Sequence, residues 1–201
     1  GQSVSGDTFS MINLPSGELL MALSDGMGSG TSAFDDSKNV IELLEQMSEA
    51  GFSQTSAIRL INSLYVSDQE FENYATLDIS LINLYKGECS FLKNGAVGTY
   101  VLNQGKMYCI EGQSLPMGVV SDAEPYIGKM SLYPGDYVIM MTDGVADMFS
   151  QERYNLEKFI KQIEIVNPGD MAQAIVDEAV SRNKGTVSDD MSVIVAGVWE
   201  N

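Results

Sequence analysis

The sequence predicts an α+β fold in which helices pack on antiparallel β-sheets. Two observations predict it: short turn signals such as 86–88 join successive apolar, strand-like runs, and segments with apolar residues at helical spacing are inserted in pairs between them. No linker or composition shift divides the 201 residues, so we expect a single domain over 1–201. Because the chain opens directly into strand-like sequence without an initiating Met, we expect it to be a fragment of a longer parent protein.

The elements of the first part are expected as a hairpin followed by two helices. Residues 8–14 and 18–24 flank the turn signal at 15–17 and are predicted to pair. Helices are predicted over 35–50 and 53–65 from their apolar spacing. Further strands are expected at 76–85, 89–95, 98–103, 106–110, 136–142 and 191–199, and further helices at 156–163 and 170–183.

Composition excludes several classes of function. The chain has 28 acidic and 11 basic residues and a net charge of −17, which argues against nucleic-acid binding. No apolar run approaches the length of a membrane span, so we expect a cytoplasmic domain without direct membrane contact, and an anchor elsewhere in the parent stays open. Histidine is absent, so an enzyme of this sequence must work with carboxylates. Cys89 and Cys109 are expected to be buried free thiols.

Each strand of the predicted hairpin carries an acidic residue at the open end, away from the turn. Asp7 lies nine residues before Ser16, at the centre of the turn, and Asp25 lies nine residues after it, so a simple antiparallel register sets the two opposite each other. Two like charges in that position are destabilising, and a cation between them would reverse the sign. The alternative is that both acids face water at a fraying strand end.

The second half of the chain repeats the arrangement. Asp143 ends one apolar strand, and Asp189 and Asp190 begin another, so an antiparallel pairing would bring them together. Four acid positions would then gather at one edge of the sheets, where carboxylates suit hard cations such as Mg²⁺ and Mn²⁺. Gly26 and Gly144 follow their acids and permit close backbone approach.

The motifs SGD, SDGMGSG, TDGVAD and DDMSVIV, in this order, resemble the metal-dependent type 2C protein serine/threonine phosphatase superfamily. Within it, they are most similar to the stage II sporulation protein E family, over essentially the whole chain. The resemblance implies a four-layer α-β-β-α sandwich, a two-metal centre holding Mn²⁺ or Mg²⁺, and a phosphoserine substrate on an anti-anti-sigma factor, whose dephosphorylation promotes activation of a sporulation sigma factor.

The resemblance also implies roles for individual residues. Asp25 would bridge the two ions, Gly26 would contribute its carbonyl, Asp7 would hold one ion, and Asp143 and Asp189 the other, with Asp25 and Asp143 as the catalytic acids. Two further acids are candidates for supporting these ligands: Asp190, where many relatives have Asn, and Asp147, for which a helix or turn cap is an equal alternative.

Alternative functions stay open at this point. A catalytically silent domain that keeps the fold and binds a partner is one, and a stress-response phosphatase of the same superfamily with a different anti-anti-sigma substrate is another.

Ser24 and Thr142 precede the two strand-end acids, and we expect their hydroxyls to satisfy backbone groups rather than to act as nucleophiles. Asp36, in the predicted helix 35–50, is assigned to the helix surface.

Overall fold

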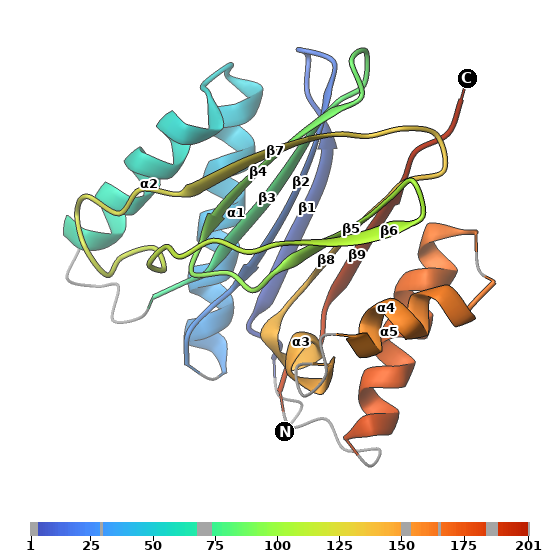
Figure 1. Ribbon diagram of the computed structural model, residues 1–201. Coiled ribbons are helices and arrows are strands. Elements are labelled where there is room, and N and C mark those ends of the chain that lie inside the picture. Colours follow the sequence, from blue (N-terminus) through green and yellow to red (C-terminus); the bar gives the residue numbers. More distant parts are fainter. Residues whose placement is uncertain are drawn as a thin grey trace. The chain divides into compact units, whose positions relative to one another are not determined.

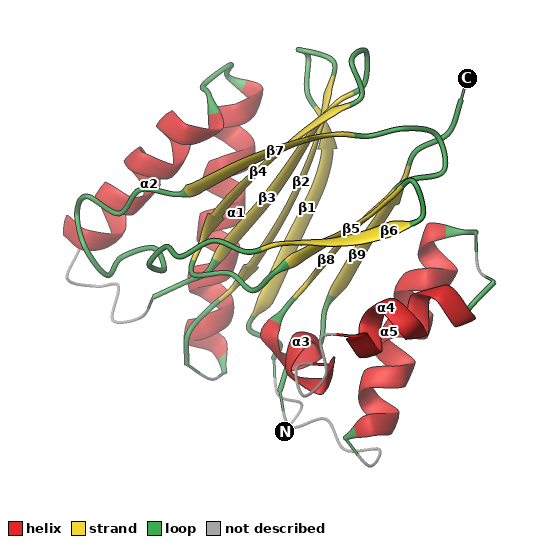
Figure 2. Cartoon of the chain, in the orientation of Figure 1, coloured by secondary structure: helices red, strands yellow, loops and turns green. Residues whose placement is uncertain are grey.

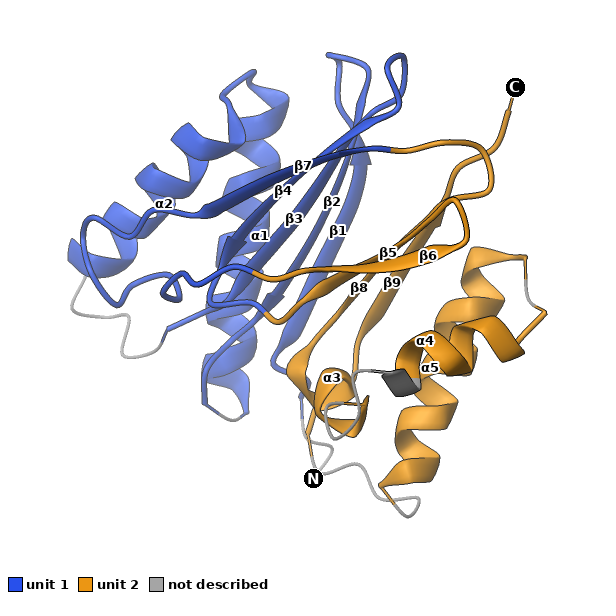
Figure 3. Cartoon of the chain, viewed as in Figure 1, with its two compact units in different colours: residues 1–96, 112–131 blue, residues 97–111, 132–201 orange. Residues whose placement is uncertain are grey.

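The computed structural model describes residues 4–28, 30–67, 74–149, 154–164, 166–183 and 189–200. The chain divides into two compact units (Figure 3). Unit 1 comprises residues 1–96 and 112–131, and unit 2 comprises residues 97–111 and 132–201. The prediction of one domain over 1–201 stays a prediction, and each unit is described by itself.

Unit 1 is built on a five-stranded antiparallel sheet with the strand order β1-β2-β3-β4-β7 (Figures 1 and 2). The predicted hairpin is confirmed, and it places β1 at one edge of the sheet. Its strands are β1 (Asp7–Asn13), β2 (Glu18–Asp25), β3 (Leu77–Asn83), β4 (Glu88–Asn94) and β7 (Tyr126–Ser131).

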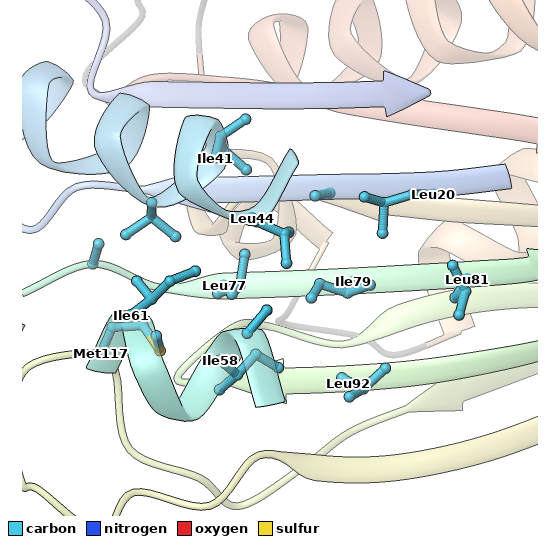
Figure 4. Packing of buried hydrophobic residues seen from close by; sticks show 14 of the residues in the cluster. Leu20, Ile41, Leu44, Ile58, Ile61, Leu77, Ile79, Leu81, Leu92 and Met117 are labelled. Atoms are coloured by element: carbon cyan, nitrogen blue, oxygen red, sulfur yellow. The ribbon is translucent and has the colours of Figure 1, made fainter. Parts of the chain in front are cut away.

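Two helices, α1 (Thr31–Glu49) and α2 (Gln54–Ser67), cover one face of this sheet. Their apolar stripes pack on the strand residues that point to that face, and the resulting core is shown in Figure 4. Alternation along the strands places every second residue in this core. The core includes Leu20, Val40, Ile41, Leu44, Ile58, Ile61, Leu77, Ile79, Leu81 and Leu92.

Unit 2 has a four-stranded antiparallel sheet with the order β6-β5-β8-β9. Buried side chains of β8 and β9 form a second core with apolar residues of the three helices. The elements are β5 (Thr99–Asn103), β6 (Lys106–Ile110), β8 (Tyr137–Met141), α3 (Asp143–Phe149), α4 (Tyr154–Gln162), α5 (Pro168–Arg182) and β9 (Val193–Gly197).

The predicted α+β class, with two antiparallel sheets flanked by helices, is confirmed. Sequence reasoning missed β7 and α3. Strand β7 has no fully buried side chain and contains Gly128, so it lacks the apolar alternation that marks a strand. Helix α3 is only seven residues long. Within the described part of the chain, no helix is both long and apolar enough to cross a membrane.

Candidate metal centre

The acids of the hairpin are directly opposed. In the β1–β2 register Asp7 pairs with Asp25, as predicted. Both residues are partly exposed. Strand β3 continues the sheet on the other side of β2, and therefore Asp25 does not lie at a free edge.

The backbone of Asp25 is fixed by Thr76, a residue that sequence reasoning did not single out. Thr76 Oγ1 accepts a hydrogen bond from the Asp25 N–H (3.0 Å), and the Thr76 N–H donates to the Asp25 carbonyl (2.8 Å). The Ser24 hydroxyl donates to the Thr76 carbonyl (2.7 Å), which confirms that this hydroxyl satisfies a backbone group. Three hydrogen bonds thus hold the strand end that carries Asp25.

Gly26 has to be glycine because helix α1 passes directly over it. A Cβ built at residue 26 would lie 1.9 Å from the carbonyl oxygen of Ala33, in the first turn of α1. The N–H of Gly26 donates to the Gly6 carbonyl (3.2 Å), and Gly26 forms an antiparallel bridge with Ala75. The close backbone approach predicted for this residue is therefore an approach of the helix.

In unit 2, Asp143 begins α3 at the point where β8 ends beside the segment that leads into β9. The pairing of Met141 with Val193 sets this register. The Thr142 N–H donates to the Ser192 carbonyl (3.1 Å), and the Ser192 N–H donates to Thr142 Oγ1 (3.0 Å). The expected antiparallel pairing of these two segments, and the backbone role of the Thr142 hydroxyl, are confirmed.

Gly144 is the counterpart of Gly26. A Cβ at residue 144 would lie 2.2 Å from the Asp190 carbonyl oxygen and 3.3 Å from the Asp189 Cβ, so the start of α3 lies against Asp189 and Asp190. Asp189 Oδ1 accepts a hydrogen bond from the Asp190 N–H (2.9 Å). Asp143, Asp189 and Asp147, one turn further along α3, are exposed, and Asp190 is half-buried.

The structure thus brings the predicted acids together as two groups, one in each unit. Asp7, Asp25 and Gly26 lie at one end of the β1–β2 hairpin, and Asp143, Asp189 and Asp190 lie at the junction of β8, α3 and β9. Among the described residues, no cluster of three or more Asp, Glu, Cys or His side chains is arranged to hold a metal ion. The gathering of all four acid positions at one edge stays a prediction.

Two expectations about individual residues are wrong. Asp36 is buried (6% exposed), because it belongs to the inward stripe of α1, and its carbonyl accepts a hydrogen bond from the Tyr65 hydroxyl of α2 (2.6 Å). Cys109 is exposed, because it lies on the edge strand β6. Cys89 is buried and both thiols are free, as expected.

Comparison with known proteins identifies a family that this chain resembles. The family model described as stage II sporulation protein E matches residues 15–199. The stage II sporulation protein E of Priestia megaterium is 33% identical over the whole of this chain, which spans 35% of that protein.

Solved structures show the fold. The PP2C phosphatase domain of SpoIIE from Bacillus subtilis, solved with a fragment of its regulatory domain, matches with a TM-score of 0.90 and 31% identity, over 98% of this chain and 58% of that one. The catalytic domain of the serine/threonine phosphatase PstP, in complex with two manganese ions, matches with a TM-score of 0.79 over 100% of this chain and 94% of that one. Its identity of 19% shows a shared fold alone.

Proposed function

Because the chain belongs to the stage II sporulation protein E family, with a phosphatase domain of the PP2C type, we propose that it hydrolyses phosphoserine on an anti-anti-sigma factor with the help of two divalent cations. The hydrolysis would promote activation of a sporulation sigma factor. One observation carries the proposal: the directly opposed carboxylates of Asp7 and Asp25 at a partly exposed strand end.

The opposed carboxylates of Asp7 and Asp25 are more stable with a cation between them than with water alone. Like charges facing each other across an antiparallel pair are destabilising, and a divalent ion between them turns the repulsion into attraction. The donors at both acid groups are carboxylate and backbone carbonyl oxygens, which Mg²⁺ and Mn²⁺ prefer. The chain has no histidine to favour zinc at these positions.

We assign the ligands in two sets. Asp7, Asp25 and the Gly26 carbonyl would hold one ion, Asp143 and Asp189 would hold the other, and Asp25 would bridge them, which requires the two acid groups to meet. Asp190 and Asp147 would support the second set. When bound, two such cations activate a water for attack and neutralise charge on the phosphoryl oxygens.

The protein's own part in this reaction is positioning. Thr76 holds the Asp25 backbone through two hydrogen bonds, and Thr142 ties the start of α3 to Ser192. Ser24 and Thr142 are engaged with backbone groups, so neither of these two hydroxyls is prepared as a nucleophile. The proposed hydrolysis therefore needs no covalent enzyme intermediate.

The test combines two substrates with control of the metal. We expect hydrolysis of p-nitrophenyl phosphate that disappears in excess EDTA and returns with Mn²⁺, and more weakly with Mg²⁺. We also expect release of phosphate from a phosphoserine-bearing anti-anti-sigma protein. Turnover of neither substrate in Mn²⁺ would indicate a catalytically silent domain, and full turnover in EDTA would contradict the metal mechanism. If the chain prefers a stress-response anti-anti-sigma protein to a sporulation one, the proposed substrate is wrong and the proposed metal-dependent hydrolysis stands.

A further inference from the structure

A buried ion pair lies on the same sheet that carries Asp7 and Asp25. Lys93 Nζ is 2.7 Å from Asp78 Oδ2, and the two side chains are 0% and 2% exposed. The two residues face each other across β3 and β4 in the antiparallel register. Burial raises the pKa of the Cys89 thiol, and the nearby Asp78 carboxylate adds to this effect.

The register places this pair beside the acids. Leu23 of β2 pairs with Asp78 of β3, and Asp25 lies two residues further along β2 on the same face as Leu23. Asp25 and Asp78 are thus diagonal neighbours, a relation in which Cα atoms of adjacent strands are about 7–8 Å apart. Asp7 stands opposite Asp25 and completes a row of three carboxylates across β1, β2 and β3.

The opposite face of the sheet is apolar, which fixes the direction of these side chains. Leu77 and Ile79, on either side of Asp78, belong to the core with α1 and α2, as does Leu92 beside Lys93 (Figure 4). Asp78 and Lys93 therefore point away from the helices, to the face shared by Asp7 and Asp25.

Stability alone does not account for a buried ion pair in this position. Taking two charges out of water costs about as much as their attraction returns, and apolar residues of similar volume are often as good or better. A lone Asp78 carboxylate at this distance, however, would add a third negative charge next to two proposed cation ligands.

We propose that Lys93 pairs with the Asp78 carboxylate and thereby keeps a third carboxylate from binding the cation held by Asp7 and Asp25. This inference rests on the proposed function. Lys93 is in this view a positioning residue: it sets where on the sheet the cation binds without contacting the reacting atoms. Asp78 in turn keeps the ammonium group from repelling the cation.

The test is a charge cycle over the pair, read by Mn²⁺ affinity rather than by activity alone. Lys93→Met removes the positive charge, and we expect Mn²⁺ to bind about tenfold more tightly while turnover falls, because Asp78 draws the ion from its place. Asp78→Asn leaves the ammonium without its counter-charge, and we expect Mn²⁺ to bind about tenfold more weakly. The double variant should bind Mn²⁺ as the unaltered chain does, and Lys93→Arg, which keeps the charge, is the matched control.

Affinity is taken from a Mn²⁺ titration by thermal shift, with each variant compared to its own metal-free melting temperature, so that a loss of stability does not enter the comparison. A purely structural pair would lower the metal-free melting temperature in both single variants and leave Mn²⁺ affinity unchanged, and that result would overturn the inference. Should Lys93→Met fail to fold, Asp78→Asn and the double variant still have to differ in Mn²⁺ affinity. If the unaltered chain binds no Mn²⁺, the proposed function fails and the inference fails with it.

Discussion

The two Asp-Gly motifs share a pattern but are held differently. In unit 1, Asp25 ends a strand that has a neighbour on each side, and Thr76, the residue before β3, fixes its backbone. In unit 2, Asp143 begins a short helix and is exposed, and the contacts that hold this junction come from the segment leading into β9. The same hydroxyl-Asp-Gly pattern thus ends a strand in one unit and begins a helix in the other.

This difference suggests why the two acids would take different roles. A ligand that bridges two ions has to keep its position against charge on both sides, and the strand end of Asp25 is braced by β1 and β3. Asp143 lies at a helix terminus, and we assign it as a ligand that holds one ion.

The largest effect is expected from Asp25→Asn. Loss of the bridging ligand should lower turnover by about three orders of magnitude or more. Without metal, the variant should melt at the same temperature as the unaltered chain or higher, because a repulsion with Asp7 is relieved. Mn²⁺ should stabilise the variant less than the unaltered chain in a thermal-shift titration.

The control for this variant has to be an acid outside the site. Asp36 does not serve, because it is buried between α1 and α2, whereas Asp35 next to it is exposed. Asp35→Asn should change neither turnover nor the response to Mn²⁺. Equal stabilisation of Asp25→Asn and the unaltered chain by Mn²⁺ would mean that Asp25 is not a ligand of the metal.

Much of this geometry could be predicted from the sequence because local signals determine it. The turn at 15–17 sets the register of the hairpin, so the pairing of Asp7 with Asp25 follows from counting residues. The apolar runs that become β8 and β9 likewise indicated that Asp143 lies near Asp189 and Asp190.

What could not be predicted depends on contacts between distant segments. The pairing of Lys93 with Asp78 requires knowledge of which strands are neighbours, and each residue alone is only a charge inside an apolar run. The burial of Asp36 does have a local signal, because Asp36 shares a helix face with Ala33 and Val40. The reason for glycine at residue 26 is the passage of α1, which no local pattern reports.

The next effect concerns the acids of unit 2. Asp143→Asn and Asp189→Asn should reduce Mn²⁺ stabilisation and turnover to a similar extent, because both would hold the same ion. The double variant should lose little more than either single variant, since residues that act as a unit are not additive. Additive losses in a Mn²⁺ titration of the three proteins would show that the two acids serve different ions.

Substitution of the two glycines should affect folding before it affects metal binding. A methyl group at Gly26 meets the Ala33 carbonyl at 1.9 Å, and one at Gly144 meets the Asp190 carbonyl at 2.2 Å, so a backbone segment has to move in each case. We expect each Ala variant to lose about 1–3 kcal/mol in free energy of unfolding, with the larger loss at Gly26. Gly169→Ala, where the nearest atom is a side-chain oxygen at 3.2 Å, is the control and should lose less, as measured by urea denaturation.

The smallest loss of stability is expected at the hydroxyl residues that precede the acids, Ser24 and Thr142. The loss should differ between the two motifs. Ser24→Ala removes one donor to the Thr76 carbonyl, whereas Thr142→Val removes the acceptor of the Ser192 N–H as well as the donor to the Asp190 carbonyl. An ordinary hydrogen bond contributes about 1 kcal/mol, and a buried N–H left without an acceptor costs more than the loss of one donor. Urea denaturation should therefore show a loss of about 1 kcal/mol for Ser24→Ala and a larger loss for Thr142→Val.

Both variants should keep most of their Mn²⁺-dependent turnover, because neither hydroxyl attacks the phosphate. A variant that folds with the expected stability and binds Mn²⁺ normally, yet has no turnover, would identify its hydroxyl as a nucleophile and contradict the direct attack of water.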